Sequence, residues 1–173
     1  TRYVQKSSLP VAYGGFGTQL TAYGFDLALT FDYQLGGRVF DSRYQTLMSN
    51  LSDAGDAGKA IHEDVLKSWT PENTSSRLPR YRYGDQYNSF GSDRWMASAR
   101  YLNFQSFSVG YTLPKSLVSR FGLNKLRVYA TGENLCFWSV RRGLDPRYSY
   151  SGNTSVNVYS PVRTIMGGIQ LSF

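Results

Sequence analysis

Residues Pro161–Phe173, which read PVRTIMGGIQLSF, contain the pattern that decides the fold class of this chain. From Thr164 onward, apolar or very small side chains alternate with mostly polar ones. One face would carry Ile165, Gly167, Ile169, Leu171 and Phe173, and the other Thr164, Met166, Gly168, Gln170 and Ser172. A period of two indicates a β-strand whose two faces meet different surroundings. The strand therefore needs an apolar environment on one side and a polar one on the other.

Four further segments alternate in the same way. With the final segment, 162–173, the expected strands lie near residues 16–22, 25–36, 99–112 and 125–137. The clearest is 25–36, where one face is apolar throughout and the other includes Asp26 and Asp32. Because carboxylates are costly inside lipid, this second face is expected to line a wet interior. The segments approach the about 9–11 residues with which a tilted strand crosses a bilayer.

The connections between these strands alternate between short and long. A tight turn is expected at Tyr23-Gly24, and a short helix within 113–124 that begins at Pro114 and ends at Gly122. The other two connections, 39–98 and 138–160, are long loops, with short helices expected near 42–49 and 60–67. Short turns on one side and long loops on the other are typical of outer-membrane barrels. The predicted fold class is all-β, an antiparallel transmembrane β-barrel fragment with long extracellular loops.

The composition allows this fold and offers no sign of an enzyme. Aromatic residues make up 16% of the chain, the net charge is +7 and the mean hydropathy is −0.38. No apolar run reaches the about 18 residues of a transmembrane helix. His62 and Cys136 are single, so we expect neither an intrachain disulfide nor a histidine-based zinc site. We also expect no catalytic residues, metal or cofactor, because no marked carboxylate pair, nucleophile motif or phosphate-binding loop is present.

Short motifs spread over nearly the whole chain point to a particular family. They are YGGFG (Tyr13–Gly17), FDL (Phe25–Leu27), YQLGGRV (Tyr33–Val39), WTPENT (Trp69–Thr74), YLN (Tyr101–Asn103), GYTLPK (Gly110–Lys115), LRVYA (Leu126–Ala130), GENL (Gly132–Leu135), GLDP (Gly143–Pro146) and PVRT (Pro161–Thr164). Each motif is short, and the specificity lies in their order. Together they resemble the C-terminal end of SusC/RagA-type TonB-dependent outer-membrane transporters.

The resemblance implies a plugged barrel of roughly 22 strands, of which this chain would supply about five C-terminal ones. It implies a SusD-like surface lipoprotein as partner, energy from the TonB complex through an N-terminal part absent from this sequence, and import of glycans or peptides. The location would be the outer membrane of a Gram-negative, Bacteroidetes-like cell. Because membrane barrels need at least about eight strands, the chain should pair with the remainder of the barrel, plug domain included, and with outer-membrane lipid. The start at Thr1, without a signal peptide, is likewise expected of a piece of a longer protein.

Three groups of candidate functional residues follow. The final strand resembles the signal read by the outer-membrane assembly machinery, at Gly168, Leu171 and Phe173. The lumen lining is expected to include Asp26, Asp32, Arg127 and Glu133. The loop residues expected to contact substrate or the lid protein are Trp69, Tyr81, Tyr83 and Trp95. For the tryptophans, simple packing or an interface position is the plainer interpretation.

Cations and aromatic rings interleave in residues 77–83, which read RLPRYRY. Such a stretch suits stacking on single-stranded nucleic acid, and equally a protein partner. Because no nucleic-acid-binding module surrounds it, we expect a protein partner or neighbouring loops and no nucleic acid.

Two alternatives to a transporter segment stay open on the sequence. One is a soluble β-sandwich carbohydrate-binding module, which also has short strands and aromatic loops. The charged side chains on the second face of the strands fit its packed core poorly. The other is a structural or adhesive barrel fragment without transport, which only a plug and TonB box in the parent gene would exclude.

Overall fold

The computed structural model of the chain describes residues 7–49, 58–85, 87, 90–148 and 161–173. The chain divides into two compact units. The sheet unit comprises Pro10–Gly37, Ala99–Leu144 and Tyr159–Phe173, and the loop unit comprises Thr1–Leu9, Arg38–Ser98 and Asp145–Val158. Antiparallel sheet dominates the described residues and the helices are short, which agrees with the all-β prediction.

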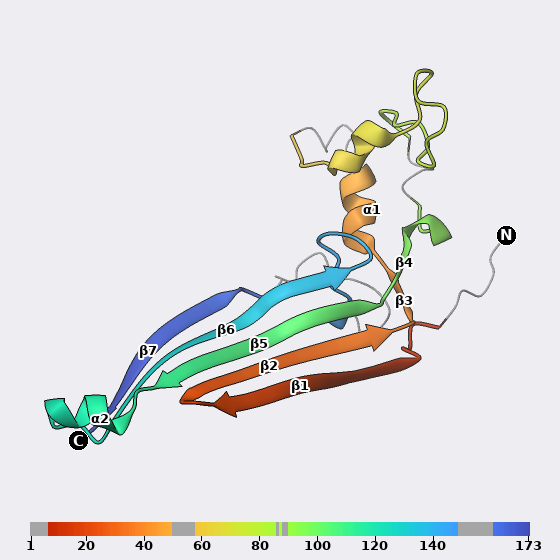
Figure 1. Ribbon diagram of the computed structural model, residues 1–173. Coiled ribbons are helices and arrows are strands. Elements are labelled where there is room, and N and C mark those ends of the chain that lie inside the picture. Colours follow the sequence, from red (N-terminus) through yellow and green to blue (C-terminus); the bar gives the residue numbers. More distant parts are fainter. Residues whose placement is uncertain (1–6, 50–57, 86, 88–89, 149–160) are drawn as a thin grey trace. The chain divides into compact units, whose positions relative to one another are not determined.

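One five-stranded antiparallel sheet forms most of the sheet unit (Figure 1). In spatial order its strands are β1 (Ala12–Ala22), β2 (Phe25–Leu35), β5 (Tyr101–Thr112), β6 (Lys125–Ser139) and β7 (Thr164–Ser172). Strand β1 begins earlier than the expected start near residue 16. Gly14, Gly15 and Gly17 hide this start in the sequence, because a glycine has no side chain to show an alternating pattern.

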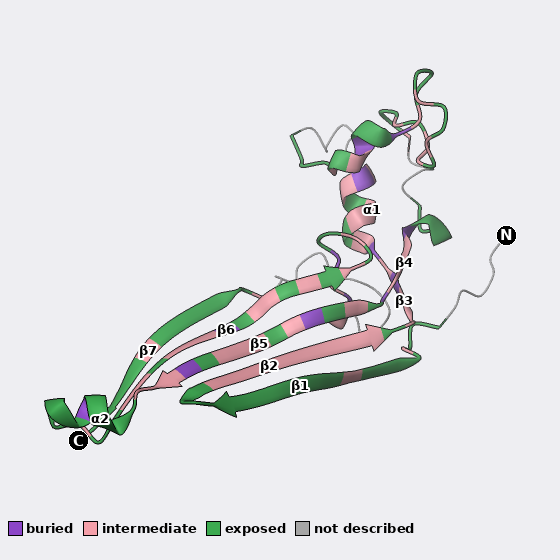
Figure 2. Ribbon diagram, in the orientation of Figure 1, coloured by how far each residue is buried: buried purple, intermediate pink, exposed green. Residues whose placement is uncertain are grey.

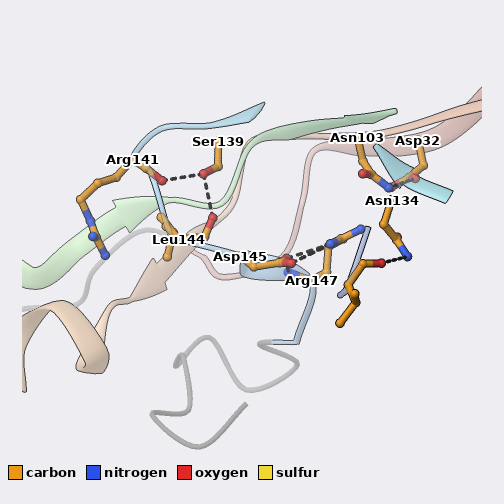
Figure 3. A network of polar contacts seen from close by, with 9 residues as sticks. Asp32, Asn103, Asn134, Ser139, Arg141, Leu144, Asp145 and Arg147 are labelled. Carbon is orange, nitrogen blue, oxygen red and sulfur yellow. Dashed lines mark hydrogen bonds and ion pairs between the residues drawn. The ribbon is translucent and has the colours of Figure 1, made fainter. Parts of the chain in front are cut away.

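Two connections close one end of this sheet. Tyr23 and Gly24 form the β1–β2 turn with φ values of 51° and 87°, as a two-residue type I′ hairpin requires. Between β5 and β6, helix α2 (Lys115–Val118) and the 3-10 helix η5 (Ser119–Phe121) precede Gly122, whose φ of 70° ends them. At the other end of β6, the Ser139 hydroxyl lies 2.7 Å from the carbonyl oxygen of Leu144 (Figure 3).

The strand register sorts the side chains into an apolar and a polar face, since directly paired residues share a face. Phe31 of β2 pairs with Phe16 of β1 and with Phe104 of β5. Their rings form a continuous stack, with centroids 5.1 Å and 4.6 Å apart. On β7, Ile169 lies opposite Val128 of β6 on this same apolar face. The other face carries the acidic and hydroxyl side chains of β2 and β5.

The apolar face of the sheet is exposed. Ile165 and Ile169 on β7 each keep 67% of their surface accessible, and Leu20 on β1 keeps 59%. Figure 2 shows β1 and β7 as exposed along most of their length. Among its described residues, the sheet unit contains no second sheet, so the apolar face is not packed against one as in a sandwich. Such a face in water is an unfavourable arrangement that calls for a partner or for lipid.

The loop unit has a small hydrophobic core of its own. Strands β3 (Arg38–Phe40) and β4 (Met96–Ser98) pair with each other, and helix α1 (Ser42–Ser49) follows β3. The 3-10 helices are η2 (Glu63–Lys67), η4 (Asp93–Trp95) and η6 (Pro146–Tyr148). Met48, Val65 and Trp95 are buried together, with Phe40, Tyr44, Leu78 and Tyr81 packed against them.

Sequence reasoning anticipated only part of the loop unit. Helix α1 lies where a helix was expected, and the expected helix near 60–67 is the shorter η2. Strands β3 and β4 were not anticipated, because three residues are too few to show a period of two. Among the described residues, no helix is long and apolar enough to cross a membrane.

Candidate functional sites

An ion pair spans three strands on the polar face of the sheet. Arg127 of β6 donates from Nε to Asp26 Oδ1 at 3.0 Å and from Nη2 to Asp26 Oδ2 at 2.5 Å. Asp26 belongs to β2, so the guanidinium reaches across β5, which separates the two strands. Such a two-pronged contact fixes the orientation of both groups, because the planar guanidinium matches the two carboxylate oxygens.

Gly110 of β5 provides the space for this ion pair. A Cβ atom at Gly110 would lie 2.5 Å from Arg127 Nη2 and 2.7 Å from Asp26 Oδ1. These separations are too short for any side chain to fit without displacing the pair. Glycine is therefore required here for the close approach of the charged side chains rather than for its backbone freedom.

Tyr129 of β6 continues this polar row towards β7. The Arg127 guanidinium carbon lies 5.2 Å from the centre of the Tyr129 ring, within cation–π distance. The ring in turn covers Gly168 of β7, where a Cβ would lie 2.5 Å from the tyrosine. Thus Gly168, expected as part of an assembly signal, has a packing role under Tyr129.

The other two expected assembly residues lie elsewhere. Leu171 pairs with Leu126 on the apolar face, and Phe173 follows β7 with 84% of its surface exposed. The assembly role of Gly168, Leu171 and Phe173 stays a prediction.

The remaining lumen candidates do not join the Asp26–Arg127 pair. Asp32 accepts a hydrogen bond of 2.7 Å from the side-chain amide of Asn103, a residue that is only 2% exposed (Figure 3). Glu133 lies opposite Thr164 and, within the described ranges, has no ion pair. Sequence reasoning missed Asn103, although an asparagine within a strand is itself unusual.

The loop candidates divide into buried and exposed residues. Trp95 is 4% exposed, and its indole N–H donates to the Phe90 carbonyl at 3.0 Å. Tyr81 is half-buried against the same core. Trp69 is half-buried, and its backbone N–H donates to the Leu78 carbonyl.

Tyr83, the fourth loop candidate, is exposed. Trp95, by contrast, is buried in the core of the loop unit, which favours a packing role for this residue.

A pocket of about 30 Å³ opens beside this core. Buried Met48, Ser68 and Trp95 form its base together with half-buried Tyr81, and its exposed rim includes Arg80 and Arg82. Of the expected loop residues, the pocket thus brings together Tyr81 and Trp95 but neither Trp69 nor Tyr83. The two arginines belong to the basic aromatic stretch seen in the sequence, whereas Ser68 gave no signal.

A polar cluster holds η2 against α1. The carboxylate of Asp64 receives the Lys67 ammonium at 2.6 Å and the Tyr44 hydroxyl at 3.0 Å. The hydrogen bond from Lys67, more than that from Tyr44, holds the pKa of Asp64 below its usual 3.8. Asp64 also lies near His62, but the described residues contain no group of three or more metal-binding side chains placed to hold an ion.

Comparison with known proteins shows which proteins this chain resembles. No family model matches the chain. A TonB-dependent receptor of Formosa agariphila is 27% identical over 169 residues, which cover 92% of this chain and 16% of the receptor. A second TonB-dependent receptor from the same organism is 26% identical over 176 residues, covering 96% of this chain and 17% of that receptor. The chain thus spans about a sixth of these curated relatives.

Solved structures agree with the sequence relatives. A structure of the RagAB peptide transporter matches 98% of this chain and 18% of its own chain, with a TM-score of 0.74 and 27% identity. The RagAB peptide importer in its open-open state matches over the same shares, with a TM-score of 0.69 and 26% identity. In sequence and in fold, therefore, the chain is similar to a segment of SusC/RagA-type TonB-dependent transporters.

Proposed function

We propose that this chain forms part of the wall and outer loops of an outer-membrane barrel that imports nutrients with energy supplied through TonB. The observation that carries the proposal is the exposed apolar face of the sheet, opposite a face with carboxylates and hydroxyls. A strand wall between lipid and a wet interior needs this combination, whereas a soluble sandwich buries its apolar face. The similarity to TonB-dependent receptors supports the same conclusion.

In this proposal the two faces of the sheet have different tasks. The apolar face, with the Phe16–Phe31–Phe104 stack, contacts lipid acyl chains. The polar face, with the Asp26–Arg127 pair, lines the interior and faces the plug domain supplied by the rest of the protein. The edge strands β1 and β7 continue the sheet into the remainder of the barrel, since an unpaired edge would not be stable in lipid.

The loop unit is the part we assign to partner and solute contacts. Long loops of this kind often carry function, and this one has its own core and an arginine-rimmed pocket. A SusD-like surface lipoprotein is the partner we propose, supported by similarity to a RagAB complex. The imported solutes would be glycans or peptides. RagAB is a peptide importer, which makes peptides one of the two classes to test.

The proposal is tested by isolating outer membranes from the source cells and measuring the intact mass of the polypeptide together with what copurifies. We expect a polypeptide several times larger than 19.5 kDa, extracted only by detergent and associated with a lipoprotein. A free species of 19.5 kDa in the soluble fraction would overturn the proposal and return attention to a carbohydrate-binding module. A structural role without transport is tested separately, by comparing solute uptake in cells with and without TonB.

A further inference from the structure

The pocket of the loop unit contains a buried hydroxyl that has no hydrogen-bond partner among the described residues. Ser68 lines the pocket and is only 4% exposed. Its backbone N–H is used, because it donates to the Val65 carbonyl at 3.1 Å. Its side-chain oxygen makes no hydrogen bond within the part of the chain that the structure describes. A buried hydroxyl without a partner is unfavourable, so the site favours a ligand that accepts its hydrogen bond.

The rim of the pocket is strongly cationic. Arg80 and Arg82 are exposed, and neither side chain makes an ion pair or hydrogen bond among the described residues. Arg94 lies 5.8 Å from the Trp95 ring and adds a third positive charge. The lining contains one acidic side chain, Asp85, whose Oδ1 accepts the Tyr87 N–H at 3.1 Å. The lining therefore carries net positive charge over an aromatic base.

We propose that this pocket binds a carboxylate group of the imported solute. The guanidinium groups of Arg80 and Arg82 would pair with the two carboxylate oxygens, and the Ser68 hydroxyl would donate a further hydrogen bond. Tyr81 and Trp95 would contact the apolar part next to the carboxylate. The inference rests on the proposed import function and adds a substrate class to it.

Two kinds of solute carry such a group, an acidic peptide and a uronic-acid oligosaccharide, and matched probes separate them. The full-length transporter, purified in detergent, is titrated calorimetrically with an octapeptide that contains one glutamate and has an amidated C-terminus, and with its glutamine counterpart. It is also titrated with a tetragalacturonate and with its methyl ester. Within each pair, one member carries ionised carboxylates and the other carries uncharged amide or ester groups in their place. We expect the charged member of one pair to bind at least about ten-fold more tightly, the usual effect of a charge-assisted hydrogen bond.

Variants connect this preference to the pocket. The double variant Arg80→Gln, Arg82→Gln should bind the charged probe about as weakly as the neutral one. Its control is Arg43→Gln, Arg77→Gln, which removes the same charge from exposed positions outside the pocket and should keep the preference. Ser68→Ala should weaken the binding of the charged probe several-fold and leave the binding of the neutral probe unchanged.

The outcomes separate the pocket from the import proposal. Folded barrels migrate differently on gels before and after boiling, so each preparation is first checked for assembly. An assembled transporter that binds charged and neutral members alike in both pairs would overturn the inference, as would a preference that survives in the Arg80, Arg82 variant. If the protein proves soluble and not a barrel, the import proposal fails. The same titrations on the soluble protein then test whether the pocket binds a carboxylate, independently of the import proposal.

Discussion

At the scale of single residues, two glycines on the polar face determine which large side chains fit there. Gly110 leaves room for the Asp26–Arg127 pair, and Gly168 leaves room for the Tyr129 ring. Neither glycine has a positive φ, so neither is present for a turn. The glycines on β5 and β7 therefore leave space for long side chains from the neighbouring strands.

Replacing Gly110 with alanine should displace the ion pair and destabilise the sheet. Overpacking of this kind costs about 1–3 kcal/mol. The measurement is the thermal midpoint of the assembled transporter. Ser108→Ala, on the same face of β5, is the control and should have little effect. Adding Arg127→Ala should reduce the cost of Gly110→Ala, because the colliding side chain is then absent. If Gly110→Ala lowered the thermal midpoint equally with Arg127 present and with Arg127→Ala, the result would contradict the proposed collision.

The Asp64 cluster makes the stability of the loop unit dependent on pH. The folded state holds the pKa of Asp64 below 3.8, so its carboxylate stabilises the fold fully above that pH. This contribution disappears as the pH falls through the lower folded pKa. Asp64→Asn should therefore lower the thermal midpoint at pH 6, and the difference from the wild type should shrink towards pH 3. A difference that stays constant between pH 6 and pH 3 would count against this role of the carboxylate.

At the scale of elements, the proposed barrel gives β7 one face for lipid and one for the interior. Ile169→Arg places a charge on the apolar face, at a cost of about 2–4 kcal/mol near the middle of the bilayer. Thr164→Arg places the same charge on the polar face opposite Glu133, and its effect on assembly should be small. Gln170 would be a poorer control, because it pairs with Arg127 and an arginine there meets a like charge. Membrane fractionation and gel migration measure assembly, and equal tolerance of both variants would refute the assignment of faces.

At the scale of the whole molecule, the long insertion 38–98 leaves and re-enters the sheet at adjacent points. The Ala99 N–H donates to the Gly37 carbonyl at 3.1 Å. The same hydrogen bond would close a four-residue β-turn if only two residues joined Gly37 to Ala99. The sheet should therefore not need the insertion in order to form.

Replacing residues 38–98 with Asn-Gly should give a barrel that still assembles, because Gly37-Asn-Gly-Ala99 can close a tight turn. The same variant should lose the lipoprotein partner and the preference for charged solutes, since both are assigned to the loop unit. Copurification from detergent extracts and gel migration provide the measurements. Failure to assemble would show that the sheet depends on the insertion, and retained lipoprotein would place the partner contact elsewhere.

Much of the sheet was predictable because its information is local. The alternation in β2 and β7, and the turn at Tyr23-Gly24, follow from side-chain periodicity and from the φ preferences of single residues. The bulge in β5 was not predictable. Phe104 and Phe107 are three residues apart, so strict alternation places them on opposite faces. The irregularity between Phe104 and Ser106 brings both to the apolar face.

By itself, then, the sequence determined that this chain forms amphipathic antiparallel strands with short turns at one end and long loops at the other, because these properties depend on neighbours along the chain. Only the tertiary structure decided which polar groups meet. The reach of Arg127 over Gly110 to Asp26 and the hydrogen bond of Asn103 to Asp32 depend on strand register. The presence of Ser68 and Arg80 in the lining of one pocket depends on loop packing. Those arrangements bring together residues that are distant in the sequence, so no local sequence pattern predicts them.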